Sequence, residues 1–211
     1  MIRLNPEQQD AVDYDGNVVV TACPGSGKTR VLTARVIRGL QELQSSRERV
    51  VALTFTNRAA DEIQVRLDNE GIPTDRLWTG TIHSFALEWV LRPYAPYCEV
   101  TRLGFSVADE FSTNQLLEVL KNEHGLDRFA DVNTAYTRSG TSLNNDDVLC
   151  EIFEEYKARL HKRKLLDYDD TLFFAYDILA KNPEIAATMG SIVRLVCVDE
   201  VQDVQDLHYA R

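Results

Sequence analysis

The sequence predicts an α/β fold in which a parallel sheet is interrupted by an inserted all-helical subdomain. Apolar, β-branched runs at 18–21, 50–55, 77–82 and 192–198 predict strands. Segments with helical apolar spacing follow the first three runs, which is typical of parallel strands joined by helices. The third and fourth runs are separated by residues 93–165, where helical spacing and polar links predict the insertion.

A glycine-rich segment joins the first strand to the first long helix. Gly25 and Gly27 allow positive φ, so the backbone can curl and direct its N–H groups at an anion. In this context Lys28 is expected to reach the β- and γ-phosphates of a nucleotide, and Thr29 to bind Mg²⁺. The alternative is a plain glycine turn. The segment consists of Ala22, Cys23, Pro24, Gly25, Ser26, Gly27, Lys28 and Thr29.

The last strand ends in two adjacent carboxylates. Asp199 and Glu200 at the tip of a buried strand need a partner, and nucleotide-bound Mg²⁺ is a natural one. Asp199 is expected to hold Mg²⁺ through water, and Glu200 to orient and deprotonate the attacking water. Gln202 adds a polar group near the γ-phosphate. A Gly-Lys-Thr loop upstream of this pair predicts a P-loop nucleotide hydrolase.

Gln8 lies in a short helix that Asn5 caps and Pro6 begins. The amide of Gln8 can donate and accept at once, which suits the N6/N7 edge of adenine. Spacing alone favours an ordinary surface glutamine over this interpretation.

Polar and aromatic residues follow the second and third predicted strands. Phe55, Thr56 and Asn57 could hold a phosphate backbone and stack a base, or could serve only capping and core packing. His83 begins the helix after the strand that contains Thr81. A lone histidine there is more often a cap or a packed side chain than a ligand.

Two helices, at 114–123 and 146–164, are predicted within the insertion, and a further helix at about 165–179 follows it. The basic run 161–164 is a solvated helix end by default, with a phosphate contact as the sharper alternative. Asp167, Asp169 and Asp170 favour a helix start, so capping explains them before a metal site does.

Composition narrows the class of protein. The chain has 211 residues, a formal net charge of −10 and a pI near 4.9, which argues against a globally basic nucleic-acid binder but not against a local groove. No apolar run predicts a membrane span, and the N-terminus lacks a signal-peptide core. Four scattered cysteines predict reduced thiols in a cytoplasmic protein.

Taken together, the motifs resemble the UvrD/Rep-like superfamily 1 DNA helicases across essentially the whole chain. Alanine is usual at the first loop position in that family, so Ala22 fits, whereas Val201 stands where Phe or Tyr is commoner. The motifs lie, in order, at residues 4–8, 22–30, 54–60, 80–84, 166–170 and 198–203.

The resemblance implies a RecA-like motor domain that uses ATP and Mg²⁺ to move 3′-to-5′ along single-stranded DNA. It implies that Gln8 reads adenine and that Arg30 lies at the nucleotide. The residues it places along the DNA are Phe55, Thr56, Asn57, Thr81 and His83. The expected domains are 1–92 and 166–211 for the two parts of the RecA-like domain, with the insertion at 93–165.

The chain ends at Arg211, shortly after the Asp-Glu motif. The family's later motifs, its second RecA-like domain and its γ-phosphate arginine are not in the sequence, so we expect an incomplete sheet and a fragment of a longer helicase. The fragment alone is expected to bind nucleotide weakly and to turn over little. The alternatives are a nucleotide-gated subunit of a repair or defence complex without unwinding activity, and a non-catalytic nucleic-acid-binding module, which the intact site residues disfavour.

Overall fold

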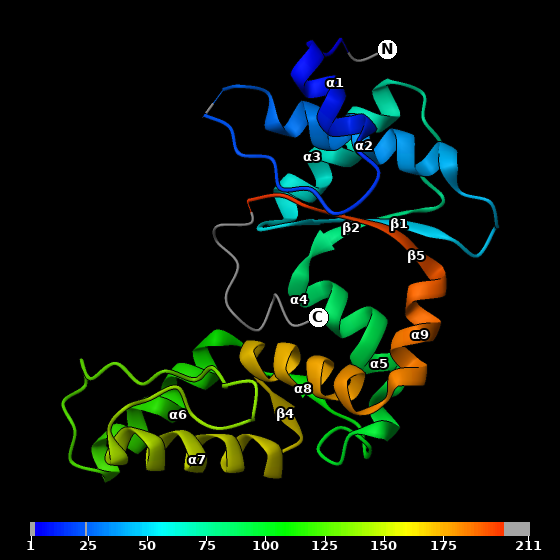
Figure 1. The fold of residues 1–211 in the computed structure, drawn as a ribbon. Coiled ribbons are helices and arrows are strands. Elements are labelled where there is room, and N and C mark those ends of the chain that lie inside the picture. The colour runs from blue at the N-terminus through cyan, green and yellow to red at the C-terminus, as the bar shows by residue number, and fades with distance from the viewer. Residues whose placement is uncertain (1–2, 24, 201–211) are drawn as a thin grey trace. The chain divides into compact units, whose positions relative to one another are not determined.

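A computed structural model describes residues 3–23 and 25–200 of the chain (Figure 1). These residues form two compact units, one made of 3–82 with 184–200 and the other of His83–Pro183. Contacts within the structure place the second unit at His83–Pro183, whereas the sequence predicts an insertion at 93–165. The domain limits of 1–92, 93–165 and 166–211 stay predictions.

The first unit contains a three-stranded parallel sheet. Strand β1 (Arg49–Thr54) lies between β2 (Leu77–Thr81) and β5 (Val193–Val198). Leu53 is level with Gly80 of β2 and with Val198 of β5, so the carboxyl ends of all three strands meet at one edge. The prediction of a parallel sheet is confirmed, and these strands match the predicted runs to within two residues.

The predicted strand at 18–21 is wrong for the described structure. These residues adopt no regular secondary structure, and Val18, Val19 and Val20 are 46%, 78% and 42% exposed. An extended segment becomes a strand only where a neighbour takes up its main-chain hydrogen bonds, and no described strand pairs with this one. The prediction that β5 is buried is also wrong, because Val196 is 48% and Val198 37% exposed.

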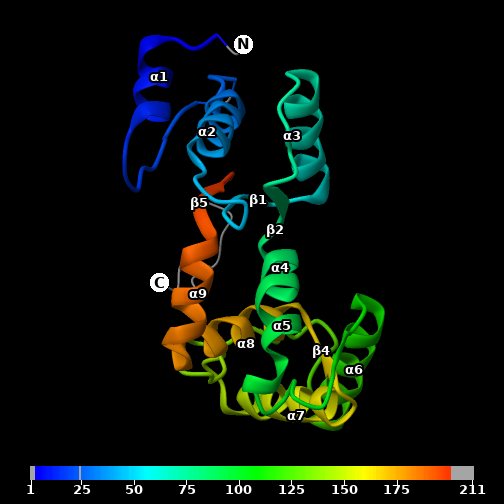
Figure 2. The ribbon, with the colours of Figure 1, turned by 90° about the vertical axis from the view of Figure 1, so that its right-hand side faces the viewer.

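Two helices cover one face of this sheet (Figures 1 and 2). Helix α2 (Lys28–Glu42) packs on β1 and β5, and α3 (Asn57–Asn69) packs on β1 and β2. Helix α1 (Pro6–Asp13) packs on α2, and α9 (Pro183–Ile192), which the sequence did not predict, leads into β5. The buried core consists of Val36, Leu40, Val50, Ala52, Ile63 and Leu67.

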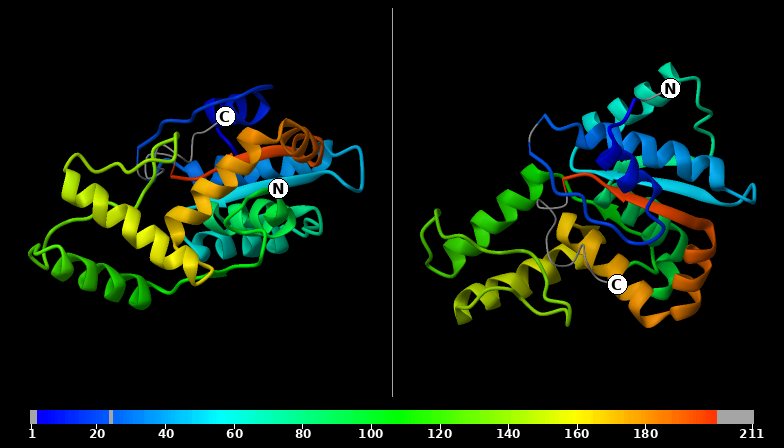
Figure 3. Two further views of the ribbon diagram at one scale, coloured as in Figure 1. Left: turned by 90° about the horizontal axis from the view of Figure 1, so that it is seen from below. Right: turned by 45° about the horizontal axis from the view of Figure 1, so that its top comes forward.

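The second unit is mainly helical. A continuous helical segment crosses from the first unit into it, and the predicted insertion helices correspond to α6 and α7, which lie side by side (Figures 1 and 3). Its elements are α4 (Ile82–Phe85), η1 (Ala86–Leu91), α5 (Arg92–Tyr94), η2 (Ala95–Tyr97), β3 (Ser106–Val107), α6 (Glu110–Glu123), α7 (Asp147–Lys162), β4 (Leu165–Leu166) and α8 (Tyr168–Lys181).

The prediction of an all-helical segment needs one correction. Strands β3 and β4 form a short parallel pair, and Tyr136 bridges Ser142 in the long link between α6 and α7. The residues at 165–166 therefore belong to a strand, and the helix predicted from residue 165 begins at Tyr168. No helix within the described ranges is long and apolar enough to cross a membrane.

Candidate nucleotide and nucleic-acid site

The glycine loop curls as its sequence predicts. Gly25 and Gly27 have φ of 79° and 93°, in the left-handed region that favours glycine. The N–H of Ser26 donates to the carbonyl of Cys23 at 3.1 Å, which closes the turn. Gly27 is the N-cap of α2 and supplies no side-chain cap, so the start of this 15-residue helix presents main-chain N–H groups to an anion.

The side chain of Lys28 stays with the loop. Its Nζ donates to the carbonyl oxygen of Ala22 at 3.3 Å, so the ammonium lies against the main chain of the loop. Thr29 is half-buried in the first turn of α2, and Arg30 next to it is exposed. Pro24 lies outside the described residues. These groups suit a polyphosphate, because an ammonium and helix N–H groups face the same space.

Gln8 touches the loop although it lies 18 residues before Ser26. Its Nε2 donates to the carbonyl of Ser26 at 3.0 Å, and its Oε1 accepts from the N–H of Asn5 at 3.0 Å. Asn5 in turn accepts from the N–H of Gln8 at 2.8 Å, which completes a capping box and confirms the predicted start of α1. The structure therefore holds Gln8 beside the loop. The second N–H of its amide has no partner among the described residues and can donate to a ligand.

Asp199 follows β5 at the edge where the parallel strands end. Its N–H donates to the carbonyl of Leu53 at 2.9 Å, which extends the pairing with β1 by one residue. Burial raises the pKa of its carboxyl group, the charge of Glu200 raises it further, and the charge of Lys28 lowers it.

Glu200 has a φ of 51°, unusual for a residue with a side chain, and its N–H donates to Oδ1 of Asp199 at 3.1 Å. Gln202 lies outside the described residues. No group of three or more His, Cys, Asp or Glu side chains that could hold a metal gathers within 3–23 and 25–200. A hydroxyl such as Thr29 and one carboxylate such as Asp199 fit Mg²⁺ that arrives with a nucleotide, because Mg²⁺ keeps waters and takes phosphate oxygens.

The segment that follows β1 caps a helix and also presents exposed side chains. Oγ1 of Thr56 accepts from the N–H of Ala59 at 3.2 Å, so Thr56 caps α3, as the capping alternative predicts. The ring of Phe55 is 66% exposed beside it, and Asn57 is exposed in the first turn. Thr81 is half-buried at the end of β2.

His83 belongs to the second unit, and its ring meets that of Tyr168 edge-on at 5.4 Å. Burial lowers its pKa, and the charge of Asp169 opposes that shift. The ring is therefore favoured in its neutral form. This is the packed side chain that the sequence alone favours for a lone histidine at a helix start.

Asp167 and Asp170 form a capping box at the start of α8, which confirms capping as their first role. The sequence did not predict what else binds them. Nζ of Lys157, on α7, lies 2.8 Å from Oδ2 of Asp167 and 3.1 Å from Oδ1 of Asp170. His161, in the run considered for phosphate contact, instead lies with its Nε2 3.1 Å from Asp170. The sequence signal that could have indicated these ion pairs is the position of Lys157 on the apolar face of α7.

Comparison with known proteins agrees with the motifs. The family model of the UvrD/REP helicase N-terminal domain matches residues 4–210. The chain is 30% identical over 227 residues to ATP-dependent DNA helicase UvrD1 of Mycobacterium tuberculosis, a match that covers 98% of this chain and 29% of that protein. It is 28% identical over 228 residues to ATP-dependent DNA helicase PcrA of Bacillus subtilis, with 98% and 30% covered.

PcrA of Staphylococcus aureus is likewise 28% identical, over 225 residues. The chain spans about three tenths of the length of these curated relatives. A family match over almost the whole chain confirms the resemblance seen in its motifs. The chain belongs to the UvrD/REP helicase family and corresponds to the N-terminal domain of its members.

Proposed function

We propose that this chain is the N-terminal motor part of an ATP-dependent DNA helicase that couples ATP hydrolysis to 3′-to-5′ movement on single-stranded DNA. The observation that carries the proposal is the curled glycine loop at the start of α2, where Lys28 donates to the carbonyl of Ala22 and Gln8 donates to the carbonyl of Ser26. Relatives named as ATP-dependent DNA helicases support the assignment of ATP and DNA.

Each residue at the loop has a role in this proposal. Lys28 and the N–H groups of α2 bind the phosphates, and Gln8 contacts the adenine. Thr29 and Asp199 would hold Mg²⁺, which supplies charge stabilisation at the phosphates when bound. Glu200, with Gln202 nearby, orients the attacking water and accepts its proton. The remaining nucleotide contacts belong to Ala22, Cys23, Pro24, Gly25, Ser26, Gly27 and Arg30.

The proposed DNA contacts are Phe55, Thr56, Asn57, Thr81 and His83. Support comes from the exposed ring of Phe55, which offers a face for base stacking. Thr81 is level with Thr54 at the strand ends, the edge at which open α/β sheets bind ligands. The capping hydrogen bond of Thr56 leaves the hydroxyl free to donate to a phosphate oxygen.

The proposal also includes the RecA-like architecture with an insertion at 93–165 and further helicase domains as partners. Exposed apolar residues at 18–20 and on β5 support a sheet that another strand completes. A second domain would supply the arginine that stabilises charge at the γ-phosphate. Without it we expect hydrolysis by the 211-residue chain to be slower by orders of magnitude.

Nucleotide binding by the 211-residue chain is the first test. Titration with a fluorescent ATP analogue and Mg²⁺ should show weak saturable binding that Lys28→Ala lowers by about tenfold or more, because a hydrogen bond to a charged group is worth about 1.5–3 kcal/mol. Lys181→Ala is the matched control, because Lys181 is an exposed lysine paired with Asp177 on α8. Equal affinity of the parent and the Lys28→Ala variant would contradict the site.

The motor function is tested in the longer protein. ATP hydrolysis should rise with single-stranded DNA, and Glu200→Gln should abolish hydrolysis while ATP binding persists. Unwinding of a duplex that carries a 3′ single-stranded tail, but not of one that carries a 5′ tail, would establish 3′-to-5′ movement. Stimulated hydrolysis without unwinding would instead favour a nucleotide-gated subunit of a larger assembly. Hydrolysis that DNA does not change would contradict the proposal.

A further inference from the structure

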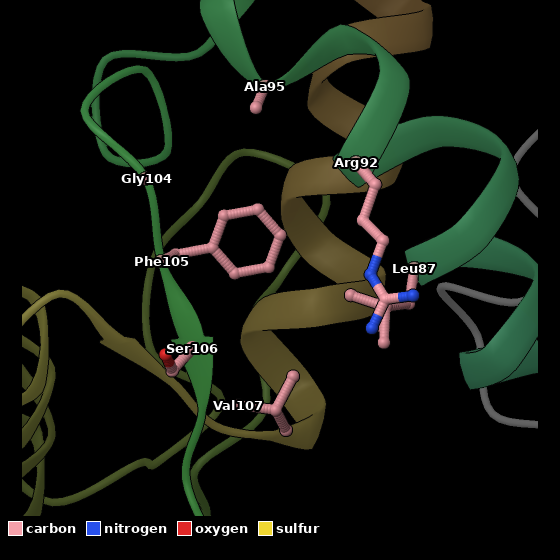
Figure 4. Close-up of a pocket in the computed structure, with 7 residues that line it drawn as sticks. All are labelled: Leu87, Arg92, Ala95, Gly104, Phe105, Ser106 and Val107. Atoms are coloured by element: carbon pink, nitrogen blue, oxygen red, sulfur yellow. The ribbon is translucent and has the colours of Figure 1, made fainter.

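The second unit contains a cavity of about 550 Å³ between its first helical segment and the strand β3 (Figure 4). This volume falls in the usual range of ligand pockets, roughly 300–1,000 Å³. Phe105 and Val107 project from the strand toward the side where Leu87 and Arg92 lie, whereas Ser106 points the other way. The cavity therefore combines apolar side chains with one guanidinium group and polar main-chain atoms.

Arg92 has no ion pair or hydrogen bond of its side chain with any residue in the described part of the chain. Other arginines there do have carboxylate partners. Arg102 lies 3.7 Å from Glu99, and Arg159 pairs with Glu123. An exposed arginine at an apolar cavity gives that cavity a preference for a ligand that combines an anionic group with an apolar one.

The main chain of β3 adds hydrogen-bonding groups at one edge of the strand. The N–H of Ser106 donates to Lys164 at 2.9 Å and that of Ala108 to Leu166 at 2.8 Å, so these alternate residues use the edge that faces β4. In a parallel pair the residues between them direct their N–H and C=O groups to the opposite edge. Phe105 and Val107 therefore present a strand edge that no other described strand covers.

We propose that this cavity is a docking site for an extended peptide of a partner protein, with an acidic side chain on Arg92 and an apolar side chain against Phe105 and Val107. A peptide strand satisfies all three features, because its main chain matches the open edge of β3. Nucleic acid satisfies fewer of them, because it has no main chain that matches the open strand edge.

The test uses fluorescein-labelled seven-residue peptides of alternating Val and Thr with a central Asp or a central Lys, followed by anisotropy with the 211-residue chain. The Asp peptide should bind at least tenfold more tightly than the Lys peptide, since a hydrogen bond to a charged group is worth about 1.5–3 kcal/mol. Arg92→Glu should reverse this order, whereas Arg102→Glu, the matched control, should leave it unchanged. Bound Asp peptide should also slow amide exchange at 105–107.

The reversal distinguishes a lost contact from a lost fold, because an unfolded variant cannot gain affinity for the Lys peptide. Equal binding of both peptides, or the same order in the parent and the Arg92→Glu variant, would overturn the proposal. Binding of a labelled oligonucleotide that Arg92→Glu abolishes, with no peptide binding, would overturn it in favour of a nucleic-acid contact. None of these outcomes depends on ATP hydrolysis, so they are independent of the proposed motor function.

Discussion

Replacing Lys157 with methionine should destabilise the second unit more than any exchange of a surface charge. Lys157 is 4% exposed, and its Nζ lies 2.9 and 2.8 Å from the two carboxylate oxygens of Asp167 and 3.1 Å from Asp170. It also lies 4.5 Å from the ring centroid of Tyr136. Methionine keeps much of the volume and removes the charge, so two buried carboxylates lose their ammonium.

The magnitude follows from this burial. Removing one member of a buried ion pair costs about 3–5 kcal/mol, because the remaining charge is left in a medium that solvates it poorly. The hydrogen bonds that Asp170 accepts from Tyr136 and His161 remain, which places the expected loss at the lower end of that range. The control Lys181→Met removes an exposed pair with Asp177 and should cost at most about 1 kcal/mol.

The assay is urea unfolding of the 211-residue chain followed by fluorescence of Trp89, which lies in the second unit, in a common Trp78→Phe background. Adding Asp167→Asn to Lys157→Met should recover part of the loss, because asparagine still caps α8 and removes one unpaired charge. A Lys157→Met chain within about 1 kcal/mol of its parent would refute the reasoning. So would a double variant less stable than the single one.

Three further predictions concern the loop and the buried acids. Gly27→Ala should cost about 1–2 kcal/mol in urea unfolding, because φ is 93° and a Cβ would meet Nε2 of Gln8 at 3.0 Å; an unchanged midpoint would contradict this. Iodoacetamide at pH 8 should modify exposed Cys23 before Cys197, whose pKa burial raises to about 11, and Mg²⁺ with ATP should protect Cys23. Peptide mass mapping that finds Cys23 equally modified with and without ATP would contradict the site. Burial disfavours the charged form of Asp170, but the hydrogen bond from His161 and the charge of Lys157 outweigh it and lower its pKa, so its ionised form stabilises the fold above the ordinary pKa of aspartate. That contribution should fade as pH falls through the lowered pKa, and urea midpoints from pH 7 to 3 that run parallel for the parent and Asp170→Asn would refute it.

Local signals predicted much of the fold, and their failures have a common cause. The caps at Asn5, Thr56 and Asp167 depend on atoms within three residues, and the structure has all of them. The strand at 18–21 has the right composition but no described neighbour, and composition cannot show whether a partner exists. The two-residue strands β3 and β4 are too short to leave a periodic pattern.

The buried ion cluster of Lys157, Asp167 and Asp170 in the second unit also depends on contacts that local sequence does not specify. Lys157 and Asp170 are 13 positions apart in sequence. They come together only because the short segment that contains β4 joins α7 to α8. A lysine among apolar positions of α7 signals that a partner is needed, since an unpaired buried charge is costly. It does not identify the partner, because Asp167, Asp169 and Asp170 all lie at the start of α8.

The nucleotide site depends on both kinds of signal. Nearby residues determine the conformation of its loop, whereas the pairing of distant strands determines where Asp199 lies. The curl of the loop follows from Gly25 and Gly27 alone. The approach of Asp199 requires β5 to pair with β1 in one register, which the hydrogen bond from Asp199 to the carbonyl of Leu53 extends to the strand end. A shift of that register by one residue would turn the Asp199 side chain to the opposite face of the sheet. The expectation that the loop and this carboxylate lie close together therefore rests on the rule that parallel strands end at one edge of the sheet, and it stays a prediction.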